Sequence, residues 1–260
     1  MIKSIEEFIK AVREDSFSWP DHQPKWFRGE PTSDDALVPT LYRCGFAPHE
    51  NPLLQMFRAR ASGFYDEVPD REKTDQWLFL ARHVGLPTRL LDWSESALVG
   101  LYFALIEKET PAVVWMLNPL QLNHFAAGAP ADQDPNKLRE FPLPWFRPQT
   151  PRVNIAFENI RGAWELDGPG VPLPVAVHPT YVHSRLRAQG ACFTIHGKQK
   201  EGLDRLVPDS ILKWYQIDPA SHGSMLRDLQ LLGVTESVVF PDLDGLATEL
   251  KNRFSRDDVY

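Results

Sequence analysis

Residues 82–94 hold the highest concentration of chemically useful side chains in this sequence: two arginines, a histidine, an aspartate and two hydroxyl residues. Apolar segments of helical character flank this stretch, and rigid flanking elements are what hold a functional loop in place. We therefore expect a loop in which Arg89 faces an anionic ligand and Asp92 orients the arginines. The hydroxyls of Thr88 and Ser94 are expected to line the same cleft.

A second candidate for ligand binding is Arg28, which follows a tryptophan and a phenylalanine. The apolar residues before Arg28 predict a strand, and Gly29 would let the backbone turn sharply at its end. An arginine held at such a turn presents a rigid fork to a phosphate or carboxylate, with Phe27 and Gly29 beside the ligand. The alternative interpretation is a structural ion pair of Arg28 with Asp92 or Asp242.

Three further polar residues each have two interpretations. His83, at a predicted helix end, is either a general acid or base, or a histidine that the helix dipole favours. Ser94 is interpreted as the cap of a helix over 95–107 rather than as a nucleophile, and the free N–H groups of that helix start would bind anions. Gln189, before Gly190, either recognises a base edge or an amide of a ligand, or is a polar residue at the end of a strand.

Asp242 and Asp244 mark the start of a predicted carboxyl-terminal helix. One acid is expected to cap the helix and the other to pair with an arginine, in preference to a metal site. The eight histidines show no recognised metal spacing, and two cysteines are too few for a cysteine-based zinc site. We therefore expect no bound metal.

The bulk composition excludes several classes of protein. The net charge of −7 argues against broad binding to nucleic acid, although it leaves room for a local basic cleft. No apolar run approaches the roughly 20 residues of a membrane span, and the amino terminus does not resemble a signal peptide. We expect a cytoplasmic protein that does not act at a membrane.

The hydrophobic pattern predicts one α+β domain over residues 1–260, with a mixed, largely antiparallel sheet flanked by helices. Ten of the 23 prolines fall in an irregular insertion at about 126–179, whose aromatic part, 141–164, is a candidate lid or partner surface. Helices are predicted over 4–12, 52–65, 76–84, 95–107, 225–232 and 243–254. Strands are predicted over 25–29, 112–117, 175–178, 191–196, 211–217 and 237–240.

The chain resembles the FRG domain family, whose name comes from the motif that Phe27-Arg28-Gly29 matches. Further blocks that resemble the family follow the same order along the chain, over 4–12, 37–43, 53–61, 85–94, 187–197 and 240–247. The family recurs in bacterial and phage-related settings, and the resemblance therefore implies a defence-type or toxin-type role.

The order of motifs is also similar to that of one class of ADP-ribosyltransferases, in which an arginine, a hydroxyl residue and a glutamate build the site for NAD. That resemblance implies that Arg28 holds NAD and that Thr88 or Ser94 shapes the pocket. No Glu-x-Glu pair occurs in the carboxyl-terminal half, so Glu236 and Glu201 are the candidates for the acid that polarises the ribose. The implied cofactor is NAD, and the implied partner is a protein or nucleic-acid target.

Two alternatives to a transferase stay open. One is a non-catalytic module that recognises a phosphorylated ligand or a partner protein with the same arginines. The other is a phosphodiesterase or nuclease in which Asp92, Asp242 and Asp244 bind a divalent metal, with Arg28 and Arg89 as phosphate clamps. The metal alternative requires the three carboxylates to converge.

Overall fold

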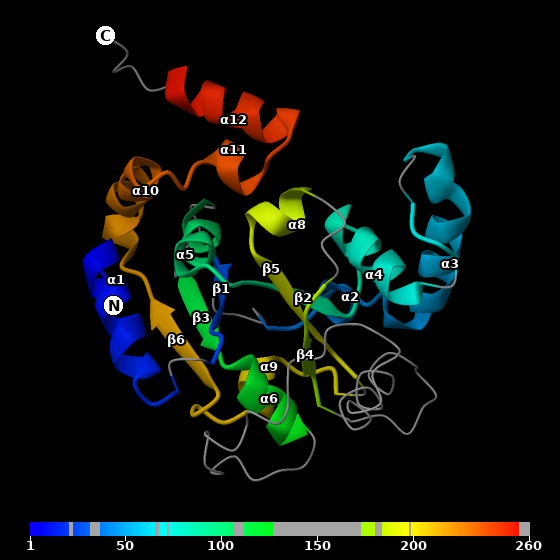
Figure 1. Ribbon diagram of the computed structural model, residues 1–260, viewed down its shortest axis with the longest axis horizontal. Coiled ribbons are helices and arrows are strands. Elements are labelled where there is room, and N and C mark those ends of the chain that lie inside the picture. Colours follow the sequence, from blue (N-terminus) through cyan, green and yellow to red (C-terminus); the bar gives the residue numbers. More distant parts are fainter. Residues whose placement is uncertain are drawn as a thin grey trace.

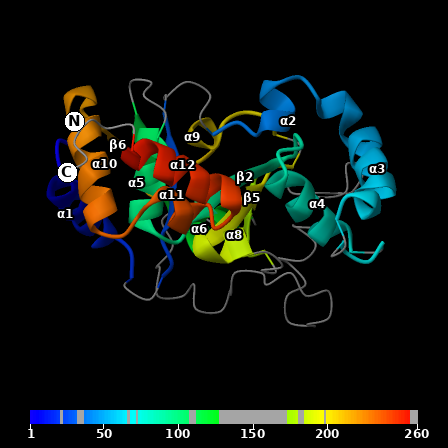
Figure 2. The same cartoon turned by 90° about the horizontal axis from the view of Figure 1, so that it is seen from above.

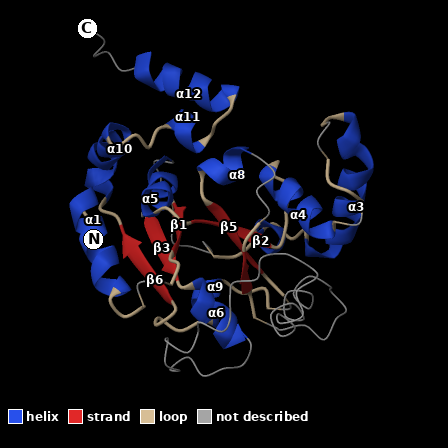
Figure 3. Ribbon diagram, viewed as in Figure 1, coloured by secondary structure: helices blue, strands red, loops and turns tan. Residues whose placement is uncertain are grey.

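An open antiparallel sheet of six strands runs through the described part of the chain (Figures 1 and 3). The computed structural model describes residues 1–20, 23–31, 37–65, 68–71, 73–106, 112–126, 173–179, 184–197 and 199–254. The strands stand in the order β4-β5-β2-β1-β3-β6. Their bounds are Trp26–Glu30 (β1), Leu90–Ser94 (β2), Val113–Leu117 (β3), Val175–Val177 (β4), Ala191–Ile195 (β5) and Leu212–Gln216 (β6).

Helices surround this sheet, as Figures 1 and 2 show. The longer ones are α1 (Ile5–Ser16), α3 (Glu50–Arg60), α4 (Thr74–His83), α5 (Ala97–Ile106), α10 (His222–Leu231) and α12 (Leu243–Phe254). The shorter ones are α2 (Thr40–Arg43), α6 (Pro119–Ala126), α8 (Ser184–Ala188), α9 (Leu203–Leu206) and α11 (Glu236–Val239). No described helix combines the length and the apolar character that crossing a bilayer requires.

The main core lies where α1, α5 and α10 pack on β1 and β3. Phe8 of α1, Leu101 of α5 and Met225 of α10 are fully buried there against Phe27 and Met116 of the sheet. Ser4 caps α1, because its Oγ accepts the N–H of Glu7 at 3.2 Å, as the capping-box pattern predicts. The apolar pattern of the sequence thus identifies the helices that form this core.

Two glycines set how closely β1 and α5 approach each other. A Cβ at Gly29 would lie 1.9 Å from the carbonyl oxygen of Gly100 and 2.3 Å from the backbone N of Ala104. A Cβ at Gly100 would in turn lie 2.7 Å from the Cβ of Phe27. The predicted sharp turn at Gly29 is wrong, since Gly29 lies inside β1 and is in register with Val114. Glycine is required there because the helix backbone occupies the space of a side chain.

Most predicted elements are confirmed to within a few residues. The exceptions begin with 90–94, which we expected in a loop and which form β2 in the middle of the sheet. Residues 237–240, predicted as a strand, lie mostly within the short helix α11. Almost all of the proline-rich insertion, including its aromatic part, lies outside the described residues, and β4 is in its last part.

The helix α3 also differs from its prediction at both ends. It begins at Glu50 rather than at Pro52, because a 3-10 turn over Ala47–His49 leads directly into it. It ends at Arg60, and the chain then turns, so that the side chain of Phe64 is 91% exposed instead of extending a buried stripe. Likewise α4 begins at Thr74, one residue before its predicted cap Asp75.

The contact between β1 and α5 leads to a stability prediction. We expect Gly29→Ala to lower the free energy of unfolding by about 3 kcal/mol or more, because the added methyl group meets backbone atoms that cannot rotate away. Urea unfolding followed by circular dichroism measures this. Gly63→Ala is the matched control: a Cβ there meets no atom within 4 Å, so we expect a change below about 0.5 kcal/mol. Equal effects of the two substitutions would contradict this account of the packing.

Candidate functional site

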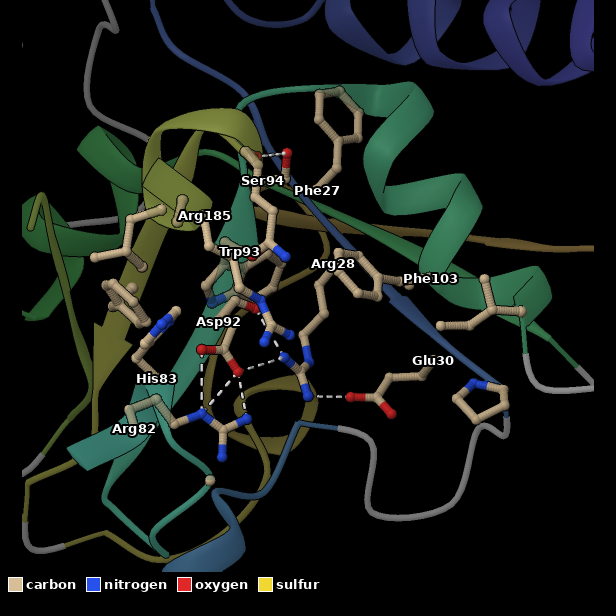
Figure 4. Close-up of a pocket in the computed structure, with 18 of the residues that line it drawn as sticks. Phe27, Arg28, Glu30, Arg82, His83, Asp92, Trp93, Ser94, Phe103 and Arg185 are labelled. Atoms are coloured by element: carbon tan, nitrogen blue, oxygen red, sulfur yellow. Dashed lines mark hydrogen bonds and ion pairs between the residues drawn. The ribbon is translucent and has the colours of Figure 1, made fainter. Parts of the chain in front are cut away.

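A cavity of about 690 Å³ opens between β1, β2, α4, α5 and α8 (Figure 4). Three arginines and two carboxylates give its lining a surplus of positive charge; they are Arg28, Arg82, Arg185, Glu30 and Asp92. Aromatic side chains form much of the remaining wall, namely Phe27, Trp93, Phe103 and Phe193. His83, Ser94 and Gln189 complete the polar part of the lining.

The cavity forms where β1 and β2 separate. The two strands are in register at Phe27 and Ser94, while β1 continues along β3 through all five of its residues. Beyond that pair, the guanidinium of Arg28 takes the place of a strand neighbour: its Nη1 donates to the backbone oxygen of Asp92 at 2.8 Å. An arginine side chain therefore satisfies a carbonyl group that the split in the sheet exposes.

Asp92 joins two of the arginines (Figure 4). Its carboxylate accepts bonds from Nε of Arg82 at 3.1 and 2.8 Å and also pairs with Nη2 of that residue. Nη1 of Arg28 lies 3.8 Å from Oδ2 of Asp92, and Nη2 of Arg28 pairs with Glu30. The predicted ion pair of Arg28 with Asp92 is therefore present, whereas Asp242 is not its partner.

The electrostatics of Asp92 follow from these contacts. Burial alone would raise the pKa of Asp92, but the charge and hydrogen bonds of Arg82 and the charge of Arg28 outweigh it and hold the pKa below its usual value. The charge of Asp92 in turn raises the pKa of Arg82. Asp92 and Arg82 are therefore both ionised at neutral pH, and this part of the cavity wall keeps fixed charges.

Arg185 differs from the other two arginines of the cavity, because no described carboxylate is bonded to its guanidinium. Its guanidinium lies 4.4 Å from the ring centroid of Phe240, a cation–π contact. Within the described part of the chain it makes no hydrogen bond or close ion pair. Burial lowers its pKa, and the more distant charges of Asp242 and Asp92 oppose that shift. Its N–H donors are therefore free to bind an acceptor that enters the cavity.

Arg89 does not line this cavity, although we expected it to face a ligand beside Asp92. Its side chain is 4% exposed and forms a bidentate pair with Glu50, whose side chain is 7% exposed. Nε of Arg89 donates to Oε1 of Glu50 at 2.7 Å. Buried charges need this kind of pairing, so Arg89 connects α3 to the start of β2 instead of serving a ligand.

The two hydroxyl candidates divide in the same way. Thr88 is buried, and its Oγ1 lies 3.4 Å from the backbone N of Leu90, away from the cavity. Ser94 lines the cavity as expected, and its Oγ donates to the carbonyl of Gln189 at 2.6 Å. It is the end of β2 rather than the helix cap; the Oγ of Ser96 accepts the N–H of Val99 at 3.3 Å and caps α5.

Of the remaining candidates, His83 and Gln189 line the cavity and Glu236 does not. Nε2 of Gln189 donates to the carbonyl of Val239 at 3.0 Å, which joins the start of β5 to α11. Glu236 accepts a hydrogen bond from the hydroxyl of Tyr102 of α5 and is not among the residues that line the cavity. The structure therefore does not support Glu236 as the acid of this site, and the acid–base role of His83 stays a prediction.

The three acids of the metal alternative do not form a cluster. Asp242 caps α12, since its Oδ1 accepts the N–H of Gly245 at 2.7 Å, as predicted for one of the two acids. Asp92 is held by arginines instead. Among the described residues, which include all three acids, no group of three His, Cys, Asp or Glu side chains is arranged to hold a metal ion. The phosphodiesterase alternative thus loses its proposed ligands.

Three charged residues of the cavity were not among the predicted site residues: Glu30, Arg82 and Arg185. Glu30 directly follows the recognised Arg-Gly pair, so its position next to Arg28 was a usable signal. Arg82 and Arg185 are charged residues on helices, a pattern that usually indicates a solvent-exposed face. Nothing in their local sequence shows that α4 and α8 point these side chains at β1 and β2.

The pair of Arg89 and Glu50 leads to a prediction about stability. We expect Arg89→Ala to lower the free energy of unfolding by roughly 3–5 kcal/mol, because it leaves Glu50 buried without a partner. The double substitution Arg89→Met with Glu50→Met should recover much of that loss, since it removes both charges. Chemical denaturation compares them, with the exposed Arg43→Ala as the control. An Arg89→Ala variant as stable as this control would contradict a structural role.

A comparison with protein-family models finds one match for this chain. The family model described as FRG domain matches residues 23–112, which include Arg28, Glu30, Arg82 and Asp92. No curated protein and no solved structure matches the chain. The ion-paired arginines of the cavity thus come largely from the matched segment, while α8 adds Arg185 from outside it. Residues 23–112, about a third of the chain, thus match the FRG domain model, in agreement with the resemblance that the sequence motifs indicate.

Proposed function

We propose that the chain binds a phosphate-bearing nucleotide, NAD in the first instance, in the cavity between β1, β2, α4, α5 and α8. One observation carries this proposal: the cavity contains three arginines against two carboxylates, and the donors of Arg185 have no acceptor in the described part of the chain. A planar guanidinium with free N–H groups binds phosphate oxygens through paired, charge-assisted hydrogen bonds.

The walls of the cavity support a nucleotide over inorganic phosphate. Its volume of about 690 Å³ lies within the range of roughly 300–1,000 Å³ for small-molecule sites. Phe103 is partly exposed there, and Phe27 and Phe193 border the same space. Flat aromatic surfaces stack with nucleobases or with nicotinamide. A ligand with both a phosphate and a planar ring would satisfy both kinds of wall.

The positions of Arg28, Ser94 and Gln189 favour NAD among nucleotides. Arg28 lies in β1, Ser94 ends β2, and Gln189 lies two residues before β5. These three strands are neighbours in the sheet. Arg28 and Ser94 follow the arginine and hydroxyl order of the transferase class that the sequence resembles. At the third position, where that class has its glutamate, an amide lines the cavity instead. The positions of Arg28 and Ser94 therefore support NAD binding, whereas a reaction needs an acid from another part of the cavity.

We propose ADP-ribosyl transfer as the reaction, with Glu30 instead of Glu236 as the acid. NAD would supply the ADP-ribosyl group and release nicotinamide. The carboxylate of Glu30 lines the cavity and is held in place by Arg28. A fixed carboxylate there can accept a hydrogen bond from a ribose hydroxyl and stabilise positive charge that develops on the sugar. A toxin-type or defence-type role would follow from consumption of NAD or modification of a target.

The binding proposal predicts a contrast between two arginines of the same helix. We expect Arg185→Ala to weaken NAD binding at least tenfold, since it removes donors that have no acceptor among the described residues. Arg187→Ala should leave the affinity within about twofold, because Arg187 is exposed and does not line the cavity. Isothermal titration calorimetry of NAD, with ATP and inorganic phosphate as comparison ligands, measures both. If neither NAD nor ATP binds the wild-type chain, the nucleotide proposal fails and a module that recognises a protein is favoured.

The reaction predicts a separate effect at Glu30. We expect Glu30→Gln to retain NAD binding, because the amide keeps an oxygen for Arg28, while nicotinamide release falls about 100-fold or more. Glu236→Gln is the matched control and should release nicotinamide at the wild-type rate, since Glu236 lies outside the cavity. Chromatographic measurement of nicotinamide follows both. Wild-type protein that binds NAD but releases no nicotinamide, with or without cell extract as a source of targets, would reduce the function to binding alone.

A further inference from the structure

The carboxyl-terminal helix α12 has one face that packs on α11 and another face that no other described segment covers. Gly245 is buried, and a Cβ there would lie 2.1 Å from the carbonyl oxygen of Phe240. Glu249, one turn later, accepts bonds from the N–H and the hydroxyl of Ser237 at 2.9 and 2.5 Å. These two residues define the inner face, which rests on α11. Figures 1 and 3 show α12 at the edge of the molecule, beyond α11.

A stripe of large apolar side chains lies on the outer face. It consists of Leu243, Leu246, Leu250 and Phe254, which are 83%, 43%, 42% and 67% exposed. The spacing of three or four residues puts all four on one side of a helix, turned away from Gly245 and Glu249 by roughly 100–150° around the axis at about 100° per residue. Ala247 lies beside the middle of the stripe, where its small side chain permits a second helix to approach closely. An apolar stripe of this kind indicates an interaction surface.

The charges beside the stripe identify what fits it. On one flank lie Asp244 and, two turns later, Lys251; on the other lie Asp242 and, three turns later, Arg253. All four side chains are exposed. Each flank therefore has an acid near the start of the helix and a base near its end.

We propose that α12 pairs with α12 of a second copy of this chain, antiparallel and about a twofold axis near Ala247 and Thr248. In an antiparallel pair each flank meets the same flank of the other helix. Asp244 then faces Lys251 of the second copy, and Asp242 faces Arg253, in one and the same register. That register also places Leu246 against Leu250 and Leu243 against Phe254. A twofold contact of this kind is closed and uses the same surface twice.

The charge pattern rejects the parallel arrangement. In a parallel pair opposite flanks meet, so that Asp244 would approach Asp242 of the other copy and Lys251 would approach Arg253. Like charges at such positions oppose pairing. One helix of 12 residues offers a small surface compared with standard stable interfaces, so the equilibrium depends on concentration in the micromolar range or above.

The pairing would act close to the cavity. The α11–α12 unit holds the carbonyl of Val239, which accepts from Gln189, and the ring of Phe240, which carries Arg185. A second copy that steadies α12 would therefore also steady two residues of the cavity wall. The inference about pairing does not depend on the identity of the ligand.

Sedimentation equilibrium of the full chain, from about 1 to several hundred micromolar, tests the proposal. We expect a monomer–dimer equilibrium whose dissociation constant rises at least tenfold in Leu250→Asp. Leu231→Asp is the matched control: Leu231 is 85% exposed but lies on α10, and its substitution should leave the dissociation constant unchanged. Thermal unfolding of each variant confirms that the fold is retained, as expected for exposed positions.

Charge exchange tests the orientation. Asp244→Lys and Lys251→Glu should each weaken the dimer severalfold, and the double variant should restore it, because the facing pair is rebuilt with its signs reversed. A chain that stays monomeric throughout the concentration range overturns the proposal, as does a dimer that Leu250→Asp leaves intact. A dimer that Asp244→Lys strengthens would be parallel and would overturn the antiparallel arrangement.

Discussion

The arginines of the cavity can stand together because Asp92 lies between two of them. Two guanidinium groups held this close repel each other, and the repulsion is strong where little water screens it. The carboxylate of Asp92 takes both as partners, and its backbone oxygen binds Arg28 as well. Asp92 thereby links β1 to β2 where the two strands separate, and it connects both strands to α4. The shape and the charge of the cavity both depend on this one side chain.

Much of the fold follows from periodicity, and the exceptions have a common cause. The helices of the core were predictable because α1 and α5 show clear apolar patterns, but β2 was not. Its residues are apolar on both faces, with burial at Leu90, Leu91, Trp93 and Ser94, so alternation is missing. The turn-forming residues before it also suggested a loop. Only the pairing with β5, about a hundred residues later in the sequence, identifies this stretch as a strand.

The site was predictable where its signal is local. Arg28 stands in a short motif, and its ion pair with Asp92 was among the two alternatives that the sequence left open. The role of Arg89 depends on Glu50, thirty-nine residues earlier, and no local pattern connects a charge on α3 with the start of β2. Both Arg82 and Arg89 lie in the segment 82–94, which is rich in polar side chains. Arg89 pairs with the buried Glu50, whereas Arg82 pairs with Asp92 in the cavity wall, and these partners determine their different roles.

The contribution of Arg185 links the cavity to the end of the chain. Its guanidinium rests on the ring of Phe240, and the neighbouring Gln189 is bonded to Val239, so α8 depends on α11 for its position. The segment that provides these contacts is anchored in the main core by the buried Val239 and by the ring contact of Phe240 with Phe103, and Glu249 of α12 is bonded to it through Ser237. The matched FRG segment therefore supplies the fixed charges of the cavity. The arginine with free donors comes from a part of the chain whose support extends to α12, and any change in the position of α12 reaches the cavity through Phe240.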